Sequence, residues 1–303
     1  MKELSIIVLR EKGDLLECIQ SFSNINLNNK LEIILIINKN EYKKIDTLIK
    51  KEIEQYHVKV LQFIKDEVTM INYAINKSKG QYLLILSDNC KISEKNNINE
   101  IIKYLKKNKD ISTIISSYYY KTNDGRMIIE NPLKGMEIND PKEIIKMISV
   151  DPWFGGPLAT SIYRKKNIKK MKIKEKDKEI FDILFRINAL INSKIIQYNS
   201  TPTIIWKSTE TVQKNDEKKI KKIINIISKI KSKNELNEEE RITLATNIIL
   251  HYIRRNFDNR SLNFKNYYHI YKYILDVTGG SLNTHLKISK NILDRIIMKI
   301  IKG

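Results

Sequence analysis

The amino-acid sequence predicts an α/β fold in which a mostly parallel sheet is flanked by helices. Strand-like apolar runs alternate with helical segments from the N-terminus onward, at a spacing typical of βαβ units. The runs Leu4–Leu9, Leu31–Ile37 and Tyr82–Leu86 are apolar almost throughout, without regular polar alternation. Parallel strands have this composition because helices cover both faces of their sheet. The two observations together predict a parallel sheet.

The elements follow in order along the chain. Apolar residues at positions 15, 16, 19 and 22 recur at helical spacing behind Gly13 and Asp14, which indicates a helix after the first strand. A hairpin turn is indicated by the sequence Asn-Asp-Gly at 123–125. The other predicted strands are Val58–Phe63, Ile111–Tyr120, Lys194–Tyr198 and Pro202–Trp206. The other predicted helices are Ile45–Tyr56, Thr69–Lys77, Asn97–Lys107 and Ile180–Ile191.

The character of the chain changes after Lys214. The remainder contains no strand-like alternation and reads as about four helices, near 217–231, 238–256, 264–276 and 285–302. We therefore expect two parts: an α/β domain over residues 1–212 and an α-helical C-terminal region over 213–303.

Composition limits the function classes. The formal net charge is +20, but only nine of the 55 basic residues are Arg, and bidentate phosphate recognition favours Arg. Aromatic and Arg residues are not interleaved, so we expect no nucleic-acid partner. Two cysteines without C-x-x-C spacing and an N-terminus without a signal peptide indicate the cytoplasm. The four histidines form no ligand-spaced pair, so a zinc site is not expected.

Small polar residues follow the fourth predicted strand, where ligands bind in open α/β sheets. The segment combines Asn72, Gly80 and Tyr82 with an apolar run that ends in Ser-Asp-Asn-Cys at 87–90. It resembles the family 2 glycosyltransferases of the GT-A fold, whose pattern here is N-x-G-x-x-x-A-x-G-E-Y-I-x-F-L-D-x-D-D. The first strand, the helix with Cys18 and the strand at 32–36 also resemble this family, over roughly the first 210 residues.

The resemblance implies a site that binds a nucleotide sugar. A UDP-sugar is one expected donor. The expected donor-binding residues are Leu9, Glu11, Asn38, Thr69, Asp88 and Asn89. In an alignment without gaps, the acidic residues of the family pattern correspond to Ser87, Asn89 and Cys90 of this chain. A shift of the alignment by one residue places Asp88 at one of these acidic positions. Asp88 is then the expected ligand of Mn²⁺ or Mg²⁺, which prefer oxygen ligands. Alternatively, Asp88 and Asn89 only cap a turn, and Asn38 only occupies a βα turn.

Two further sets of residues are implied by the same resemblance. Trp153, Gly155 and Gly156 match a glycine-containing stretch that faces donor sugar and acceptor; Trp153 and Phe154 alternatively fill core. The family's catalytic Asp is absent ahead of Arg186, where Glu179 and Asp182 flank the gap. Either is a candidate general base, with Asp177 as a third choice, and a solvated helical charge is the alternative for each.

The resulting hypothesis is an inverting glycosyltransferase that acts on a glycan, lipid-linked or protein acceptor in cell-surface polysaccharide or glycan biosynthesis. The altered acids fit either a divergent enzyme in which Lys or Arg neutralises the diphosphate, or a catalytically inactive binding or scaffold protein. The segment 289–302 has an apolar face bordered by basic residues. It either packs on its own domain or contacts the inner face of the membrane.

Overall fold

The computed structural model describes residues 2–11, 13–64, 66–122, 124–133, 140, 143, 156–168, 181–182, 185–186, 189–190 and 192–207. All of these except Glu143 belong to one compact unit, Met1–Pro141 with Gly155–Thr211. The α-helical region expected at 213–303 lies outside the described residues, so the division near residue 212 stays a prediction.

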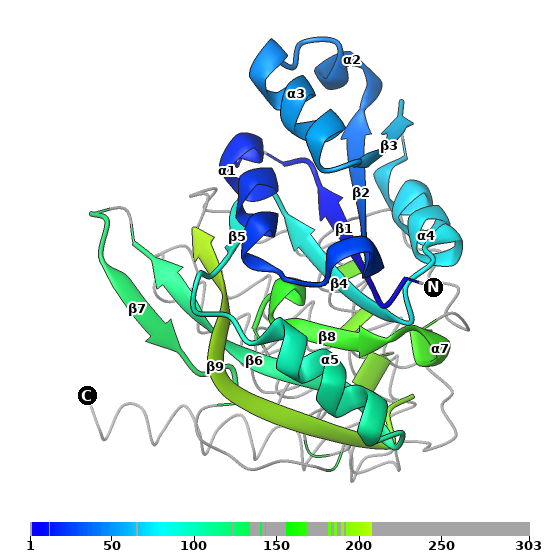
Figure 1. Cartoon of the computed structure of the whole chain (residues 1–303), viewed down its shortest axis with the longest axis vertical. Coiled ribbons are helices and arrows are strands. Elements are labelled where there is room, and N and C mark those ends of the chain that lie inside the picture. Colours follow the sequence, from blue (N-terminus) through cyan, green and yellow to red (C-terminus); the bar gives the residue numbers. More distant parts are fainter. Residues whose placement is uncertain are drawn as a thin grey trace, which may run out of the picture. The chain divides into compact units, whose positions relative to one another are not determined.

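The strands of the described part form a single nine-stranded sheet. They are β1 (Leu4–Leu9), β2 (Leu31–Asn38), β3 (Lys59–Phe63), β4 (Tyr82–Ser87), β5 (Cys90–Ile92), β6 (Ile111–Lys121), β7 (Met127–Glu130), β8 (Ser161–Arg164) and β9 (Ile195–Lys207). Their order is β3-β2-β1-β4-β8-β6-β9-β5, with β7 paired to β6 (Figure 1).

The first four strands run parallel and end at one edge of the sheet. β1 pairs with β2 and β4, and β2 pairs with β3. Leu9 lies opposite both Ile36 and Ser87, and Asn38 lies opposite Phe63, so the arrowheads of β1 to β4 point the same way in Figure 1. β6 and β9 are also parallel to each other, whereas β8 is antiparallel to β4 and β6. The predicted mostly parallel α/β sheet is confirmed.

Helices connect these strands, and three of them begin with a capping aspartate. The α-helices whose bounds lie within the described residues are α1 (Leu15–Gln20), α2 (Lys39–Tyr42), α3 (Thr47–Gln55), α4 (Glu67–Lys77), α5 (Ile98–Lys107) and α7 (Lys165–Ile168). Asp14, Asp46 and Asp66 each accept a hydrogen bond from the backbone N–H three residues later, at 2.8–3.0 Å. These bonds satisfy amides that have no partner within the first turn. In the described part of the chain, no helix is both long and apolar enough to cross a membrane.

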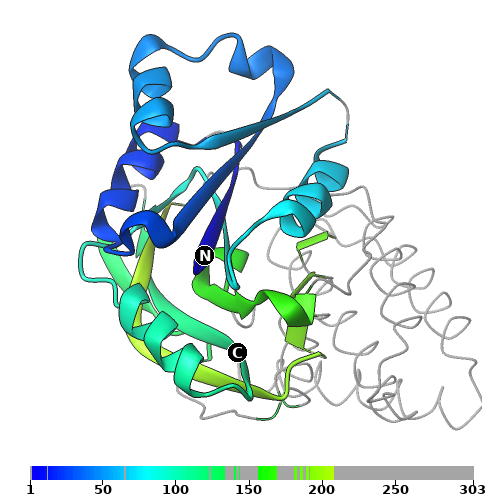
Figure 2. The same cartoon turned by 45° about the vertical axis from the view of Figure 1, so that its right-hand side comes forward.

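The core lies on both faces of the parallel strands. Alternate residues of β1, such as Ile6 and Val8, pack in one cluster with residues of α1, α3 and α5, among them Ile19, Ile53 and Ile102. The opposite face of β1 to β3 is covered by α4, whose apolar side chains are buried. Figure 2 shows α1 and α3 on one side of these strands and α4 on the other. Burial on both faces explains the apolar composition of β1, β2 and β4.

The last part of the sheet differs from the prediction of two strands, at Lys194–Tyr198 and Pro202–Trp206. The structure has one continuous strand, β9, which pairs with β6 through a register shift. Ser116 pairs with Asn199, but Tyr118 pairs with Ile204, so the extra residues of β9 bulge between them. The side-chain amide of Asn199 donates to the carbonyl of Thr201 at 2.9 Å inside this bulge. The chain therefore stays extended through Pro202, because a bulge needs no ladder hydrogen bond there.

Candidate functional site

The expected donor residues meet at the carboxyl edge of the parallel strands. Leu9 ends β1, Asn38 ends β2, and Asp88 and Asn89 follow directly after β4. Thr69 lies in the first turn of α4, which comes after β3. Because β1 to β4 are parallel, one edge of the sheet collects all of these residues. This is the edge at which ligands bind in open α/β sheets.

The Asp88 carboxylate is turned onto the loop between β1 and α1. Its side chain is fully buried, and Oδ1 accepts hydrogen bonds from the backbone N–H groups of Glu11 and Gly13, both at 3.0 Å. Oδ2 accepts from Arg10 Nη1 and forms an ion pair with it. The backbone N–H of Asp88 donates to the carbonyl of Leu9 at 3.1 Å. Asp88 thus ties the loop after β4 to the loop after β1.

Gly13 allows the two loops to touch. A Cβ built on Gly13 would lie 2.3 Å from the backbone nitrogen of Asn89 and 2.3 Å from the carbonyl carbon and oxygen of Asp88. Real side chains do not approach backbone atoms so closely, so this position requires glycine. The carbonyl of Gly13 also accepts a hydrogen bond from Arg10 Nη1 at 2.8 Å.

Arg10 is the partner of Asp88 that reaches solvent. Its side chain is 26% exposed, and Nη1 makes both of its hydrogen bonds to Asp88 and Gly13. Sequence reasoning did not select Arg10. The available signal was an arginine placed directly after an apolar strand, in a chain with nine arginines among 55 basic residues.

The donor set around Asp88 does not fit the expected divalent cation. Oδ1 already accepts two backbone hydrogen bonds, and the positive charge of Arg10 against Oδ2 repels a metal ion. Asn89 Oδ1 accepts from the hydroxyl of Ser87 and from the thiol of Cys90. Within the described residues, no three His, Cys, Asp or Glu side chains gather closely enough to hold a metal. The hydrogen bonds that Asp88 accepts hold the β1–α1 loop.

The thiol of Cys90 lies in the same cluster and is inert at neutral pH. Burial raises the pKa of Cys90 to about 12; hydrogen bonds from Ser87 oppose this rise, and the negative charges of Glu11 and Asp88 add to it. A protonated thiol is a poor nucleophile and a poor metal ligand. Glu11 adjoins this cluster, because its backbone N–H donates to Asp88.

Asn38 and Thr69 direct their polar groups to the chain around them. Asn38 Oδ1 accepts from the backbone N–H of Asn40 at 2.9 Å, and Nδ2 donates to the carbonyl of Ile64 at 3.2 Å. Thr69 Oγ1 donates to Asp66 Oδ2 at 2.7 Å. These bonds cap α2 and α4 and join the ends of β2 and β3, as the turn interpretation of Asn38 expects. Both residues nevertheless stand at the carboxyl edge of the parallel strands, where ligands bind in open α/β sheets.

A second group of candidate residues surrounds Arg186. Its side chain is buried, and Nη1 donates to the carbonyl of Gly156 at 2.7 Å. Burial raises the pKa of Tyr163 to about 12, the hydroxyl of Ser161 and the charge of Arg186 lower it, and the charge of Asp182 raises it. Asp182 and Arg186 therefore both lie near Tyr163. Arg186 thus contacts Gly156, and the charges of Arg186 and Asp182 both act on Tyr163.

The remaining expected site residues lie outside the described residues. They are Glu179, Trp153 and Gly155, and the segment 289–302 falls there as well. Their roles stay predictions.

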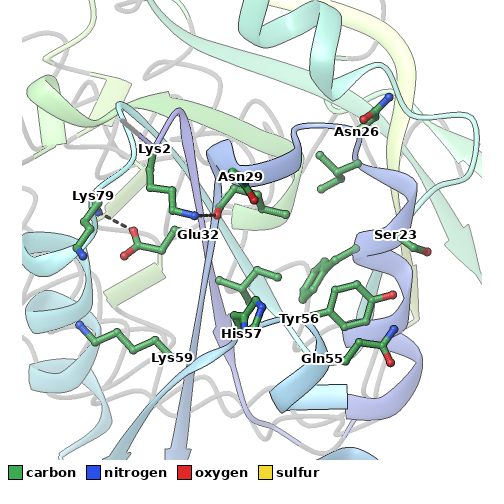
Figure 3. A pocket seen from close by; sticks show the side chains of 14 residues that line it. Lys2, Ser23, Asn26, Asn29, Glu32, Gln55, Tyr56, His57, Lys59 and Lys79 are labelled. Atoms are coloured by element: carbon green, nitrogen blue, oxygen red, sulfur yellow. Dashed lines mark hydrogen bonds between the residues drawn. The ribbon is translucent and has the colours of Figure 1, made fainter. Parts of the chain in front are cut away.

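A cavity of about 570 Å³ opens at the opposite edge of the sheet, where the parallel strands begin. Figure 3 shows Glu32 of β2 close to Lys2 and Lys79, which precede β1 and β4, with Lys59 of β3 nearby. Lys2 Nζ donates to the carbonyl of Leu31 at 2.6 Å, and Glu32 accepts from the backbone N–H of Lys79 at 2.6 Å. These bonds hold the strand starts together. The cavity contains none of the expected site residues.

No protein-family model and no curated protein sequence matches this chain. Solved structures do match. Residues 1–349 of S. aureus TarS in complex with UDP-GlcNAc align with a TM-score of 0.67 at 13% identity, covering 91% of this chain and 81% of that one. The same TarS fragment with UDP gives 0.65 at 14% identity, covering 91% and 80%.

A longer S. aureus TarS structure gives a TM-score of 0.58 at 15% identity, over 84% of this chain and 43% of that one. At these identities the matches show the fold alone. TarS is a GT-A glycosyltransferase of family 2, so the fold that the sequence resemblance implied is confirmed. The chain has a GT-A fold.

Proposed function

We propose that this protein is a glycosyltransferase that moves a sugar from a nucleotide-sugar donor to a glycan, lipid-linked or protein acceptor. The observation that carries this proposal is the GT-A fold, shared with TarS structures that contain UDP-GlcNAc and UDP. The expected donor residues at the ends of β1, β2 and β4 support it, since this edge is the usual ligand site of open α/β sheets. A UDP-sugar is the proposed donor, and cell-surface polysaccharide or glycan synthesis is the proposed setting.

The proposed reaction is a single displacement with inversion. The acceptor hydroxyl oxygen attacks the anomeric carbon, and the bond from that carbon to the diphosphate oxygen breaks. Asp182 or Glu179 takes the hydroxyl proton as general base, and the nucleoside diphosphate leaves with the bonding electron pair. The described candidate, Asp182, is half-buried and lies with Arg186 near Tyr163. A carboxylate is the usual group to accept the proton of an acceptor hydroxyl.

The segment with Trp153, Gly155 and Gly156 is proposed to receive the donor sugar and the acceptor. Support comes from Gly156, whose φ is +72° and whose carbonyl is held by the buried Arg186. The backbone is thereby fixed at this point. A fixed backbone with small residues lets a ligand approach closely without reorganisation.

Calorimetric titration of the whole chain with UDP-GlcNAc, UDP and other sugar nucleotides tests the binding part of this proposal. We expect saturable binding of at least one sugar nucleotide and competition by its nucleoside diphosphate. Release of the diphosphate, measured with glycan, lipid-linked and peptide acceptors, tests turnover. Failure of every sugar nucleotide and nucleoside diphosphate to bind would refute the donor site.

A catalytically inactive GT-A binding protein is the second candidate function. It is favoured by the replacement of the family acids with Ser87, Asn89 and Cys90, and by the engagement of Asp88 with Arg10 and backbone N–H groups. This candidate predicts that a sugar nucleotide binds and is recovered intact after incubation with every acceptor. The enzyme proposal predicts release of the diphosphate.

We place the reaction in the cytoplasm, with residues 289–302 as a proposed contact to the inner face of the membrane. The basic residues that border the apolar face of this segment support the proposed membrane contact. Co-sedimentation with vesicles of anionic or neutral phospholipid distinguishes such a contact from packing within the chain.

A further inference from the structure

We infer that Arg10 is the cation that meets the donor diphosphate, that Asp88 positions it, and that donor binding therefore needs no divalent metal. This inference rests on the proposed function, because it assigns a residue to the diphosphate of the proposed donor. It concerns a residue that the sequence resemblance does not select.

The position of Arg10 is fixed by the sheet. It follows the last residue of β1, and β1 lies between β2 and β4. The backbone N–H of Arg10 donates to the carbonyl of Ile36 at 2.9 Å, so the pairing with β2 continues past the strand end. On the other side, the backbone N–H of Asp88 donates to the carbonyl of Leu9 at 3.1 Å. The side chain of Arg10 thus starts at the carboxyl edge, between the ends of two neighbouring strands.

One nitrogen of the Arg10 guanidinium is held by hydrogen bonds, and the N–H donors of the other nitrogens are available to a ligand. Nη1 donates to the Asp88 carboxylate and to the Gly13 carbonyl, whereas Nε and Nη2 have no hydrogen-bond partner within the described part of the chain. The side chain is 26% exposed, in contrast to the fully buried side chain of Asp88. The remaining N–H groups of the planar fork match the oxygens of a phosphate.

Asp88 suits a positioning role because its charge is compensated in several ways. Two backbone N–H groups donate to Oδ1, so the carboxylate stays solvated by the protein while Arg10 contacts a ligand. Holding the long Arg10 side chain in one conformation before the ligand arrives lowers the entropy cost of binding. A positive group fixed where diphosphate charge develops also stabilises a departing nucleoside diphosphate.

A metal ion is a poor alternative at this position. The oxygen ligands that Mn²⁺ or Mg²⁺ prefer are represented by a single carboxylate that faces a guanidinium. The family acid positions around it are Ser87, Asn89 and Cys90. These residues lack the carboxylates that would attract a metal cation. Arg10 supplies the positive charge in its place.

The test is UDP binding by the whole chain, measured calorimetrically in EDTA and in Mn²⁺. Replacing Arg10 alone would leave a buried carboxylate without its ion pair. The test therefore uses the double variant Arg10→Gln with Asp88→Asn. It removes both charges and keeps side chains of similar shape. Arg126→Gln is the matched control, because Arg126 also pairs with an aspartate, Asp124, but is 76% exposed on the β6–β7 turn. Circular dichroism and thermal melting verify that each variant is folded.

We expect the Kd of the parent protein for UDP to agree within about threefold between EDTA and Mn²⁺. The double variant should bind UDP about 10- to 100-fold more weakly, the usual cost of losing hydrogen bonds to a charged group, and Arg126→Gln should match the parent. Uridine binding, followed by ligand-observed NMR, should be the same in parent and double variant because uridine carries no phosphate.

Two results overturn the inference while leaving the proposed function intact. One is UDP binding by the parent that strengthens more than tenfold on adding Mn²⁺. The other is unchanged UDP affinity in the folded double variant. A parent protein that binds neither UDP nor any sugar nucleotide, with or without Mn²⁺, overturns the proposed function and the inference together.

Discussion

Gly80 approaches Ser5 so closely that no side chain fits between them. A Cβ on Gly80 would lie 2.4 Å from the backbone nitrogen of Ser5 and 2.7 Å from the carbonyl carbon of Leu4. The backbone N–H of Gly80 donates to Ser5 Oγ at 2.8 Å, and the same hydroxyl donates to Glu32. The glycine that marks the sequence motif therefore sets the start of β4 against the start of β1.

Replacing Gly80 by alanine should destabilise the protein because the new Cβ meets backbone atoms, which cannot rotate away. We expect Gly80→Ala to lower the free energy of unfolding by about 3 kcal/mol, as overpacking a core does. Urea denaturation followed by circular dichroism measures this change.

Gly125→Ala is the control for Gly80→Ala. Nothing lies within 4 Å of a Cβ at Gly125, but its φ is +86°, so the expected cost is only about 1 kcal/mol. Equal losses in the two variants would show that close approach to Ser5 is not what requires glycine at position 80.

Arg164 joins the end of α5 to β8 and should matter for stability. Nη2 donates to the carbonyls of Leu105 and Asn108 at 2.6 and 3.1 Å, and Nε donates to the carbonyl of Ile111 at 3.0 Å. Arg164→Ala leaves these carbonyls without that donor, at a cost of about 3 kcal/mol. Arg164→Lys should recover only part of this loss, because an ammonium lacks the planar fork.

Arg126→Ala provides the comparison for Arg164→Ala in thermal and urea denaturation. Its ion pair with Asp124 is exposed, and exposed pairs contribute little to stability. A parent-like free energy of unfolding in Arg164→Ala would contradict the role given to this arginine.

Alkaline pH should destabilise the protein through Tyr163. Burial raises the pKa of this tyrosine to about 12 in the folded protein, whereas the unfolded value is about 10. Between these values the folded chain keeps a proton that the unfolded chain loses, so stability is complete below pH 10 and declines as pH rises toward 12. The contribution of one such group is about 1.4 kcal/mol per pH unit.

Tyr163→Phe isolates this effect because the variant has no hydroxyl to titrate at that position. Urea denaturation at several pH values from 9 to 12 should show a shallower loss of stability in Tyr163→Phe than in the parent. Parallel curves for the two proteins would mean that Tyr163 ionises at its ordinary pKa.

The strands β1, β2 and β4 were predictable because burial on both faces leaves a continuous apolar run. The predicted Leu4–Leu9 agrees with β1 at both ends, and β2 and β4 each extend one residue beyond their predicted ends. Short elements without such a run were not predictable. β5 has three residues, Cys90–Ile92, and is set by pairing with β9, more than a hundred residues later.

In the candidate site, the location of the residues could be predicted from the sequence, whereas their contacts could not. Position was predictable, because Asn38 and Asp88 follow apolar strands whose parallel order fixes a common edge. The partners were not predictable. Arg10 and Asp88 are 78 positions apart in the sequence, and neither the buried ion pair nor the contact of Gly13 with Asn89 leaves a local pattern. The direction of the Asp88 side chain, toward the β1–α1 loop, depends on these distant contacts.

Gly13→Ala should weaken UDP binding because a Cβ at 2.3 Å from the backbone of Asp88 and Asn89 displaces the β1–α1 loop. Loss of the hydrogen bond from Gly13 to Asp88 frees the loop that carries Arg10. We expect about a tenfold weaker Kd, corresponding to one hydrogen bond to a charged group. Calorimetry with UDP measures it, and Gly125→Ala, in a turn of the β6–β7 hairpin, should bind UDP like the parent.

Turnover distinguishes the two candidate bases. Asp182→Asn and Glu179→Gln each remove a carboxylate at nearly constant shape, and the variant that removes the base should lose about 10²-fold or more in kcat, with little change in donor affinity. The other variant should retain parent activity. Diphosphate release and donor Kd are measured for both variants beside the parent. The expected difference follows from the chemistry of the step, since the base acts on the acceptor hydroxyl and does not hold the donor. If neither amide lowers kcat, the base lies elsewhere, and Asp177 becomes the residue to test.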